Sequence, residues 1–313
     1  MNKWFRKGNA RRFYRIDMPV RHFIVPSSPI KDREIYATGA NYFPASFKSK
    51  VEAQKFHALH WANRIQEHSE ILLKIFDEII QFVEFFGECA LSISEGQNPR
   101  QDPKYWMRVH THLNGFQHAR LMEPSSPKTY QYIKMIEEKY MTFLRSMVAS
   151  IEKSTPTHFA VDDHLPHGFK VDEMISTFES AKFDKIPLVQ TLRHVSAYMD
   201  SYLEAYRYIN EDNYLKQFPS EWKVQMANVS ASGLAVHLGK RFEQYSRVDV
   251  YLYFPEDEKV LQFDGTVVDT RTDDKTLTER VAINFEFPDG VSQDYLQTQI
   301  QKQEVKDCMD IVL

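Results

Sequence analysis

The chain has 313 residues, 42% of them hydrophobic and 13% aromatic, which is enough for one large or two ordinary packed domains. Its formal net charge of −4 argues against general binding to nucleic acid, so we expect no DNA or RNA partner and only local ligand-binding cations. The two cysteines exclude a disulfide framework and indicate a reducing, cytoplasmic compartment. No apolar run is long enough to cross a bilayer, so we expect no integral membrane association.

The N-terminal stretch is basic and leads into a predicted strand. Residues 1–15 carry Arg11, Arg12 and Arg15, and they contain Gly8 but no apolar signal segment. Ile16–Val25 follows as a strand-like run, in which Pro19 indicates an edge or a strand start. The segment 35–43 is open to two interpretations, a short strand or an irregular path into the next region.

Helical periodicity begins after this strand. Ser49-Lys50-Val51-Glu52 has the form of a capping box and predicts the start of a long helix that continues to about Ser94. Asp102-Pro103 predicts the N-terminus of a shorter helix that ends near Leu121, and Ser126-Pro127 predicts the start of another long one. Two further helices are predicted over 171–179 and 188–208.

Three of these helices carry an apolar seam that must be buried against a neighbour. The first seam is Leu72, Ile75, Ile79, Phe82 and Phe86; the second is Ile133, Ile136, Tyr140, Phe143, Met147 and Ile151; the third is Leu188, Leu192, Val195, Met199, Tyr202 and Tyr206. Amphipathic helices cannot bury such stripes alone, so the spacing predicts an antiparallel helical bundle.

Strand signals return at the C-terminal end. Apolar alternation resumes after Asn228-Val229-Ser230-Ala231-Ser232-Gly233, so this polar hexapeptide is predicted to be a turn between two strands. Three more strands are predicted over 247–254, 260–270 and 280–287, and a helix over 292–309.

Two short motifs carry the chemistry. Arg11 and Arg15 lie four residues apart before the first strand, and each guanidinium can grip a phosphate or a guanine edge bidentately. In the hexapeptide, Asn228 offers an amide, Ser230 a hydroxyl and Gly233 a place where a ligand can approach the backbone closely. Together these motifs resemble the paired signature of PilZ domains, the bacterial receptors for cyclic di-GMP.

The resemblance covers roughly residues 8–30 and 220–313, and it implies an α+β fold. We expect a small antiparallel β-barrel of about six strands with a C-terminal helix, interrupted by the helical bundle. The expected domains are 1–44 and 219–313 for the barrel and 45–218 for the insertion, since most of the chain separates the two motifs. The last strand, 281–285, departs from the family pattern, which often has a glycine and an arginine there.

The resemblance also implies a ligand and a role. Cyclic di-GMP would be bound by Arg11, Arg12, Arg15, Asn228, Ser230 and Gly233. We expect no enzyme activity and no cofactor, because the sequence has no P-loop, no G-x-S-x-G and no H-E-x-x-H. Ligand binding would be coupled to a protein partner, or to self-association, through the helical insertion.

Two alternatives stay open. The barrel could be a scaffold that keeps the fold without binding nucleotide. The polar loop with His158, Asp162, Asp163, His164 and His167 could hold a metal ion and build an enzyme. The sequence leaves undecided the regulated process, the number of dinucleotides in each site, and whether the chain forms a homo-oligomer.

Overall fold

The computed structural model describes residues 14–27, 34–35, 42–238, 242–273, 278–286 and 289–310. The chain divides into two compact units. The described residues of Met1–Pro29 and Leu215–Leu313 form one unit, and those of Ile30–Tyr214 form the other. The domain boundaries drawn from the sequence, at 44/45 and 218/219, stay a prediction.

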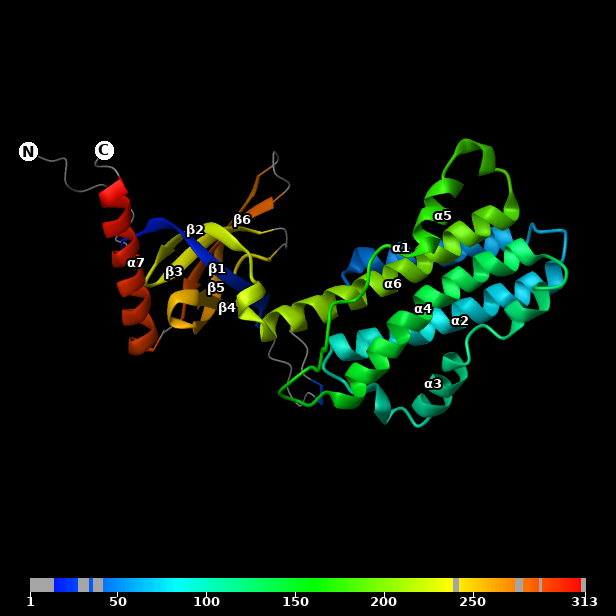
Figure 1. Cartoon of the computed structure of the whole chain (residues 1–313), viewed down its shortest axis with the longest axis horizontal. Helices are drawn as coiled ribbons and strands as arrows, with labels where there is room; N and C mark the ends of the chain where they lie inside the picture. Colours follow the sequence, from blue (N-terminus) through cyan, green and yellow to red (C-terminus); the bar gives the residue numbers. More distant parts are fainter. Residues whose placement is uncertain are drawn as a thin grey trace, which may run out of the picture. The chain divides into compact units, whose positions relative to one another are not determined.

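The first unit is built on a closed barrel of strands (Figure 1). Within the described residues the strand order around the barrel is β1-β2-β3-β6-β5-β4, and every neighbouring pair is antiparallel. The strands are β1 (Ile16–Pro26), β2 (Val224–Ser230), β3 (Gly233–Leu238), β4 (Arg247–Phe254), β5 (Lys259–Asp273) and β6 (Thr278–Phe285). The predicted antiparallel barrel is therefore confirmed, with its first strand supplied by the N-terminal stretch.

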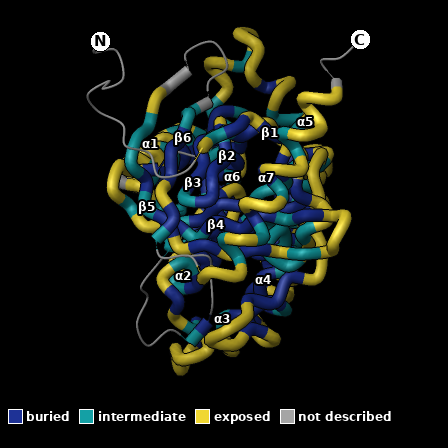
Figure 2. The backbone as a smooth tube through the Cα atoms, turned by 90° about the vertical axis from the view of Figure 1, so that its left-hand side faces the viewer, coloured by how far each residue is buried: buried dark blue, intermediate teal, exposed yellow. Residues whose placement is uncertain are grey.

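Alternation of side chains builds the barrel core. On β4, Val248, Val250, Leu252 and Phe254 point inward and are buried, because successive residues of a strand face opposite sides of the sheet. The C-terminal helix α7 (Gly290–Asp310) contacts β1 and β2 and adds Leu296 and Ile300 to the same core. In Figure 2, which colours the trace by residue burial, β2 is buried in its second half and β3 over its first four residues. A C-terminal helix packed on a barrel is what the sequence predicted.

A smaller apolar cluster lies on the outside of the barrel, where β1 meets β4. Phe23 of β1 stacks on Trp222 at a ring-centroid distance of 5.7 Å, and Tyr251 of β4 packs beside them. The Trp222 indole N–H donates to the Leu215 carbonyl oxygen at 2.5 Å. This cluster holds the segment through which the chain returns from the helices into the barrel unit.

The second unit is helical (Figure 1). Its longer helices are α1 (Ala45–Ala62), α2 (Ser69–Ser94), α4 (Pro127–Lys153) and α6 (Pro187–Gln217), and the shorter ones are α3 (Tyr105–Leu113) and α5 (Lys170–Phe178). The last residues of α6, from Leu215, belong to the barrel unit. The predicted first and second seams are buried along α2 and α4, as their periodicity requires. Of the helices in the described part of the chain, none is both long and apolar enough to span a membrane.

Two helix predictions were wrong at their boundaries. The helix expected to run from Ser49 to Ser94 is two helices, and α1 already begins at Ala45. The chain breaks between them in a polar segment that ends at His68, which has a left-handed φ of 54°. The helix expected from Pro103 to Leu121 is only α3 and the short η2 (His118–Met122), because Gly115 adopts a φ of +75° between them.

Candidate ligand-binding site

The polar hexapeptide forms a tighter turn than its composition suggested. Asn228 and Ser230 still belong to β2, Gly233 already begins β3, and only Ala231 and Ser232 lie in the turn. Ser230 pairs directly with Gly233 as the last rung of the β2–β3 hairpin. The predicted six-residue turn is thus a two-residue hairpin turn, because the strand pairing continues to its rim.

Ser230 holds this turn together from inside. Its side chain is fully buried, and its hydroxyl donates to the Gly233 carbonyl oxygen at 3.1 Å. The backbone N–H of Ser232 donates in turn to the Ser230 hydroxyl oxygen at 3.4 Å. The structure therefore gives this serine a structural task in addition to the ligand contact that the sequence predicted.

Gly233 is required by the neighbouring strand. A Cβ atom at this position would meet the Ile283 carbonyl oxygen of β6 and would lie 3.2 Å from the Asn284 Cα. The absence of a side chain lets β3 and β6 pair closely at the rim of the barrel, next to the turn.

Asn228 faces outward from β2, directly across from Asp17 of β1. Its amide nitrogen donates to Asp17 Oδ1 at 2.8 Å. Because a carboxylate only accepts hydrogen bonds, the amide nitrogen must be the atom on that side, and the carbonyl oxygen is directed away from Asp17. The half-buried amide is thereby held in one orientation.

The β1–β2 register brings Arg15, the last residue of the basic motif, to the same rim. Ile16 pairs with Val229, so Arg15 stands one residue before the first rung, and the same register carried one step further sets it opposite Ser230. Arg15 is half-buried. Arg11 and Arg12 lie outside the described residues. Of the predicted site residues, the structure thus brings together Arg15, Asn228, Ser230 and Gly233.

Sequence reasoning missed Asp17. It lies on β1, two residues after Arg15, so the alternation of the predicted strand could have pointed to it once Arg15 was chosen. Its pairing with Asn228 could not be found from the sequence, because it depends on the register between strands that are 211 positions apart.

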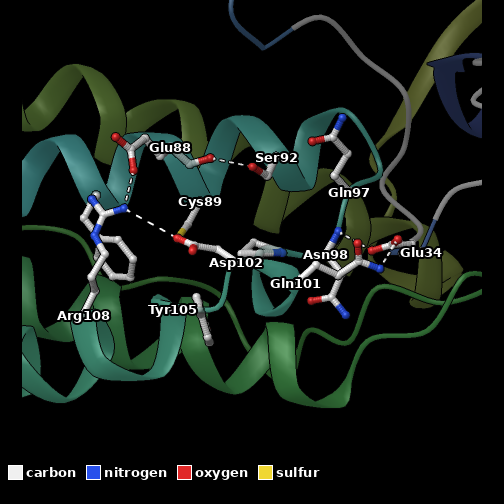
Figure 3. A pocket seen from close by; sticks show the side chains of 12 residues that line it. Glu34, Glu88, Cys89, Ser92, Gln97, Asn98, Gln101, Asp102, Tyr105 and Arg108 are labelled. Carbon is white, nitrogen blue, oxygen red and sulfur yellow. Dashed lines mark hydrogen bonds and ion pairs between the residues drawn. The ribbon is translucent and has the colours of Figure 1, made fainter.

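The helical unit has a cavity of about 440 Å³ that contains none of the predicted site residues (Figure 3). Its one arginine, Arg108, bonds Glu88 at 2.6 Å and lies 4.0 Å from Asp102. Burial raises the pKa of the Cys89 thiol at its wall to about 12, so this thiol stays protonated and unreactive near neutral pH. Within the cavity, the Arg108 guanidinium is thus paired with the carboxylates of Glu88 and Asp102.

The histidine-rich loop has its own contacts. His164 bonds Glu211 at 2.7 Å, and Asp162 bonds Lys153 at 2.6 Å. Within the residues that the structure describes, no group of three or more His, Cys, Asp or Glu side chains is arranged to hold a metal ion.

Comparison with known families matches residues 209–302 to the PilZ domain. The chain contains a PilZ domain. The matched residues comprise β2 to β6 and most of α7, and β1 completes the barrel of this PilZ domain from outside the matched range. PilZ domains are receptor and effector domains of the cyclic di-GMP family.

Among solved structures, the chain is similar to the Bacillus subtilis inhibitor of motility MotI/DgrA, with 20% sequence identity and a TM-score of 0.24. The similarity covers 28% of this chain and 44% of that one, so the match spans less than half of that protein. No curated protein matches the chain.

Proposed function

We propose that the PilZ barrel binds cyclic di-GMP at the rim where β1 begins and the β2–β3 turn lies. The observation that carries this proposal is the β1–β2 register, which sets Arg15 beside the β2–β3 turn, next to Asn228 on β2 and Gly233 on β3. Arg15 of the first motif thus lies at the rim that carries the second motif, which supports a common ligand.

The chemistry of the two motifs fits the two parts of a cyclic dinucleotide. Arg15, together with Arg11 and Arg12 of the N-terminal stretch, supplies guanidinium groups for the phosphates and for the O6/N7 edge of guanine. Asn228 supplies a neutral amide for the base. Ser230 shapes the turn, and Gly233 lets β3 and β6 pair closely beside it.

Binding would be transmitted through β1. Arg15 directly precedes this strand. Further along it, Arg21 binds the segment that returns from the helices, because its Nη1 donates to the carbonyl oxygens of Ser220 at 2.5 Å and Trp222 at 2.9 Å. Phe23 packs on Trp222 from the same strand. A ligand that fixes the start of β1 would therefore bias this return segment, and through it the affinity of the helical insertion for a protein partner.

Isothermal titration calorimetry with cyclic di-GMP tests the proposal. We expect Arg11→Ala and Arg15→Ala each to weaken binding by about 2 kcal/mol or more, since each removes charge-assisted hydrogen bonds to phosphate. Arg271→Ala is the matched control, because Arg271 is an exposed β5 arginine paired with Asp269 at 2.9 Å. Wild-type affinity for cyclic di-GMP in both the Arg11→Ala and the Arg15→Ala variants would refute this site.

A wild-type protein that gives neither heat nor a thermal shift with cyclic di-GMP would instead favour a PilZ-fold scaffold. The partner proposal has a separate test. A pull-down of the full chain with and without cyclic di-GMP should recover a partner in a nucleotide-dependent amount, and Arg15→Ala should abolish the difference.

A further inference from the structure

We propose that Asp17 makes this site selective for guanine over adenine, by orienting Asn228 and by accepting hydrogen bonds from the base itself. The inference rests on the proposed cyclic dinucleotide site and names a residue that neither motif includes. It follows from the place of Asp17 in the sheet and from the donor pattern of the two purines.

Asp17 and Asn228 form one outward-facing pair on adjacent strands. They are direct partners in the β1–β2 register, and the Asn228 amide donates to Asp17 Oδ1 at 2.8 Å. Asp17 is exposed while Asn228 is half-buried, so the carboxylate keeps access to a ligand while it holds the amide. A carboxylate has about four acceptor positions on two oxygens, and the Asn228 bond uses one of them.

The pair presents acceptors to a ligand at this point of the rim. The Asn228 nitrogen is turned toward Asp17, so the carbonyl oxygen on the other side of the amide is an acceptor for a base. The Watson–Crick edge of guanine offers two adjacent donors, N1–H and N2–H. The same edge of adenine has an unprotonated N1, whose lone pair would face the carboxylate. Adenine offers the carboxylate one donor group, N6–H2, beside this lone pair, so the Asp17 carboxylate, which only accepts, suits guanine better than adenine.

The neighbouring charge fits the same ligand. Arg15 directly precedes β1 and lies two residues before Asp17, so strand alternation carried one residue back sets their side chains on the same face. A guanidinium next to a carboxylate matches a ligand that has a phosphate near a donor-rich base edge, which describes a guanine nucleotide.

The test compares cyclic di-GMP with cyclic di-AMP on the full chain. Asp17→Asn keeps the size of the side chain and can still accept from Asn228, but it replaces one carboxylate oxygen by an amide nitrogen that donates. We expect this variant to bind cyclic di-GMP about tenfold more weakly or worse, and its preference over cyclic di-AMP to fall by a similar factor. Asp264→Asn, an exposed carboxylate on β5, is the matched control and should change neither affinity.

The outcomes separate the two proposals. A wild type that binds cyclic di-GMP, with an Asp17→Asn variant of unchanged affinity and preference, would overturn the role of Asp17 and leave the site intact. Equal weakening for both dinucleotides would also overturn it, since that result describes damage to the turn. A wild type that binds neither dinucleotide would refute the proposed function itself.

Discussion

Gly233→Ala tests whether close pairing of β3 and β6 holds the rim of the site in place. The added Cβ would come closer than 3.0 Å to the Ile283 carbonyl oxygen and to 3.2 Å from the Asn284 Cα. Both obstacles are backbone atoms of β6, so no side chain can rotate away to make room. The strands must separate at the Gly233–Asn284 rung, which lies next to the turn that carries Ser230.

The size of the effect follows from two opposing contributions. Overpacking of this kind costs about 1–3 kcal/mol, whereas replacing glycine by alanine restricts the unfolded chain and returns about 0.4–1 kcal/mol. The net loss in the free energy of unfolding is then about 1–2 kcal/mol. For a unit of this size, that loss corresponds to a decrease in Tm of roughly 3–12 °C.

Thermal unfolding followed by circular dichroism measures the stability, and titration calorimetry measures the affinity for cyclic di-GMP. Gly290→Ala is the control, because no atom lies within 4 Å of the position its Cβ would take. We expect Gly233→Ala to melt earlier and bind more weakly, and Gly290→Ala to match the wild type in binding. If Gly233→Ala melts with the wild type and binds equally well, the close approach of the two strands does not shape the site.

Three further changes probe other parts of the molecule. Ser230→Ala removes the buried hydroxyl that donates to Gly233 and should cost about 1 kcal/mol in urea unfolding. Trp222→Ala empties the outer cluster and should cost about 3 kcal/mol or more, whereas Trp106→Ala, at a 51% exposed position, should cost far less. Burial lowers the pKa of His112 to about 4, so it stays neutral in the folded protein below pH 6.5, where the unfolded chain takes up a proton. Stability should therefore fall between pH 6.5 and 4, by about 3 kcal/mol from this group, and His112→Phe should remove that part of the decline in pH-dependent denaturation.

The sequence predicted the elements whose signal is local. Val248 to Phe254 alternate over the whole of β4, and the predicted bounds of that strand are those observed. Ser126-Pro127 correctly marked the start of α4, because proline is tolerated at the first helical position. The break after Ala62 was missed because no proline or glycine marks it, whereas the break after Leu113 has an Asn114-Gly115 turn signal that the prediction passed over.

Predicting the site needed information that no single segment contains. Asn228, Ser230 and Gly233 were chosen for the polarity of their motif, yet their tasks depend on pairing: Asn228 on Asp17, and Gly233 on the β6 backbone. Strand register is set by contacts between distant segments, so the alternation in each strand reveals which face a residue takes but not its partner across the ladder.

Strand pairing joins the N-terminal strand β1 to the C-terminal strands of the barrel. β1 pairs with β2 on one side and β4 on the other, so without it both strands would present an unpaired edge. It also places Ile16, Met18, Val20 and Ile24 in the barrel core. The entropic cost of closing a connection rises only slowly with its length, and a folded insertion closes much of that connection by itself. A long helical insertion between β1 and β2 is therefore compatible with a closed barrel. The strand β1, which completes the sheet, also brings Arg15 to the rim where we propose that cyclic di-GMP binds.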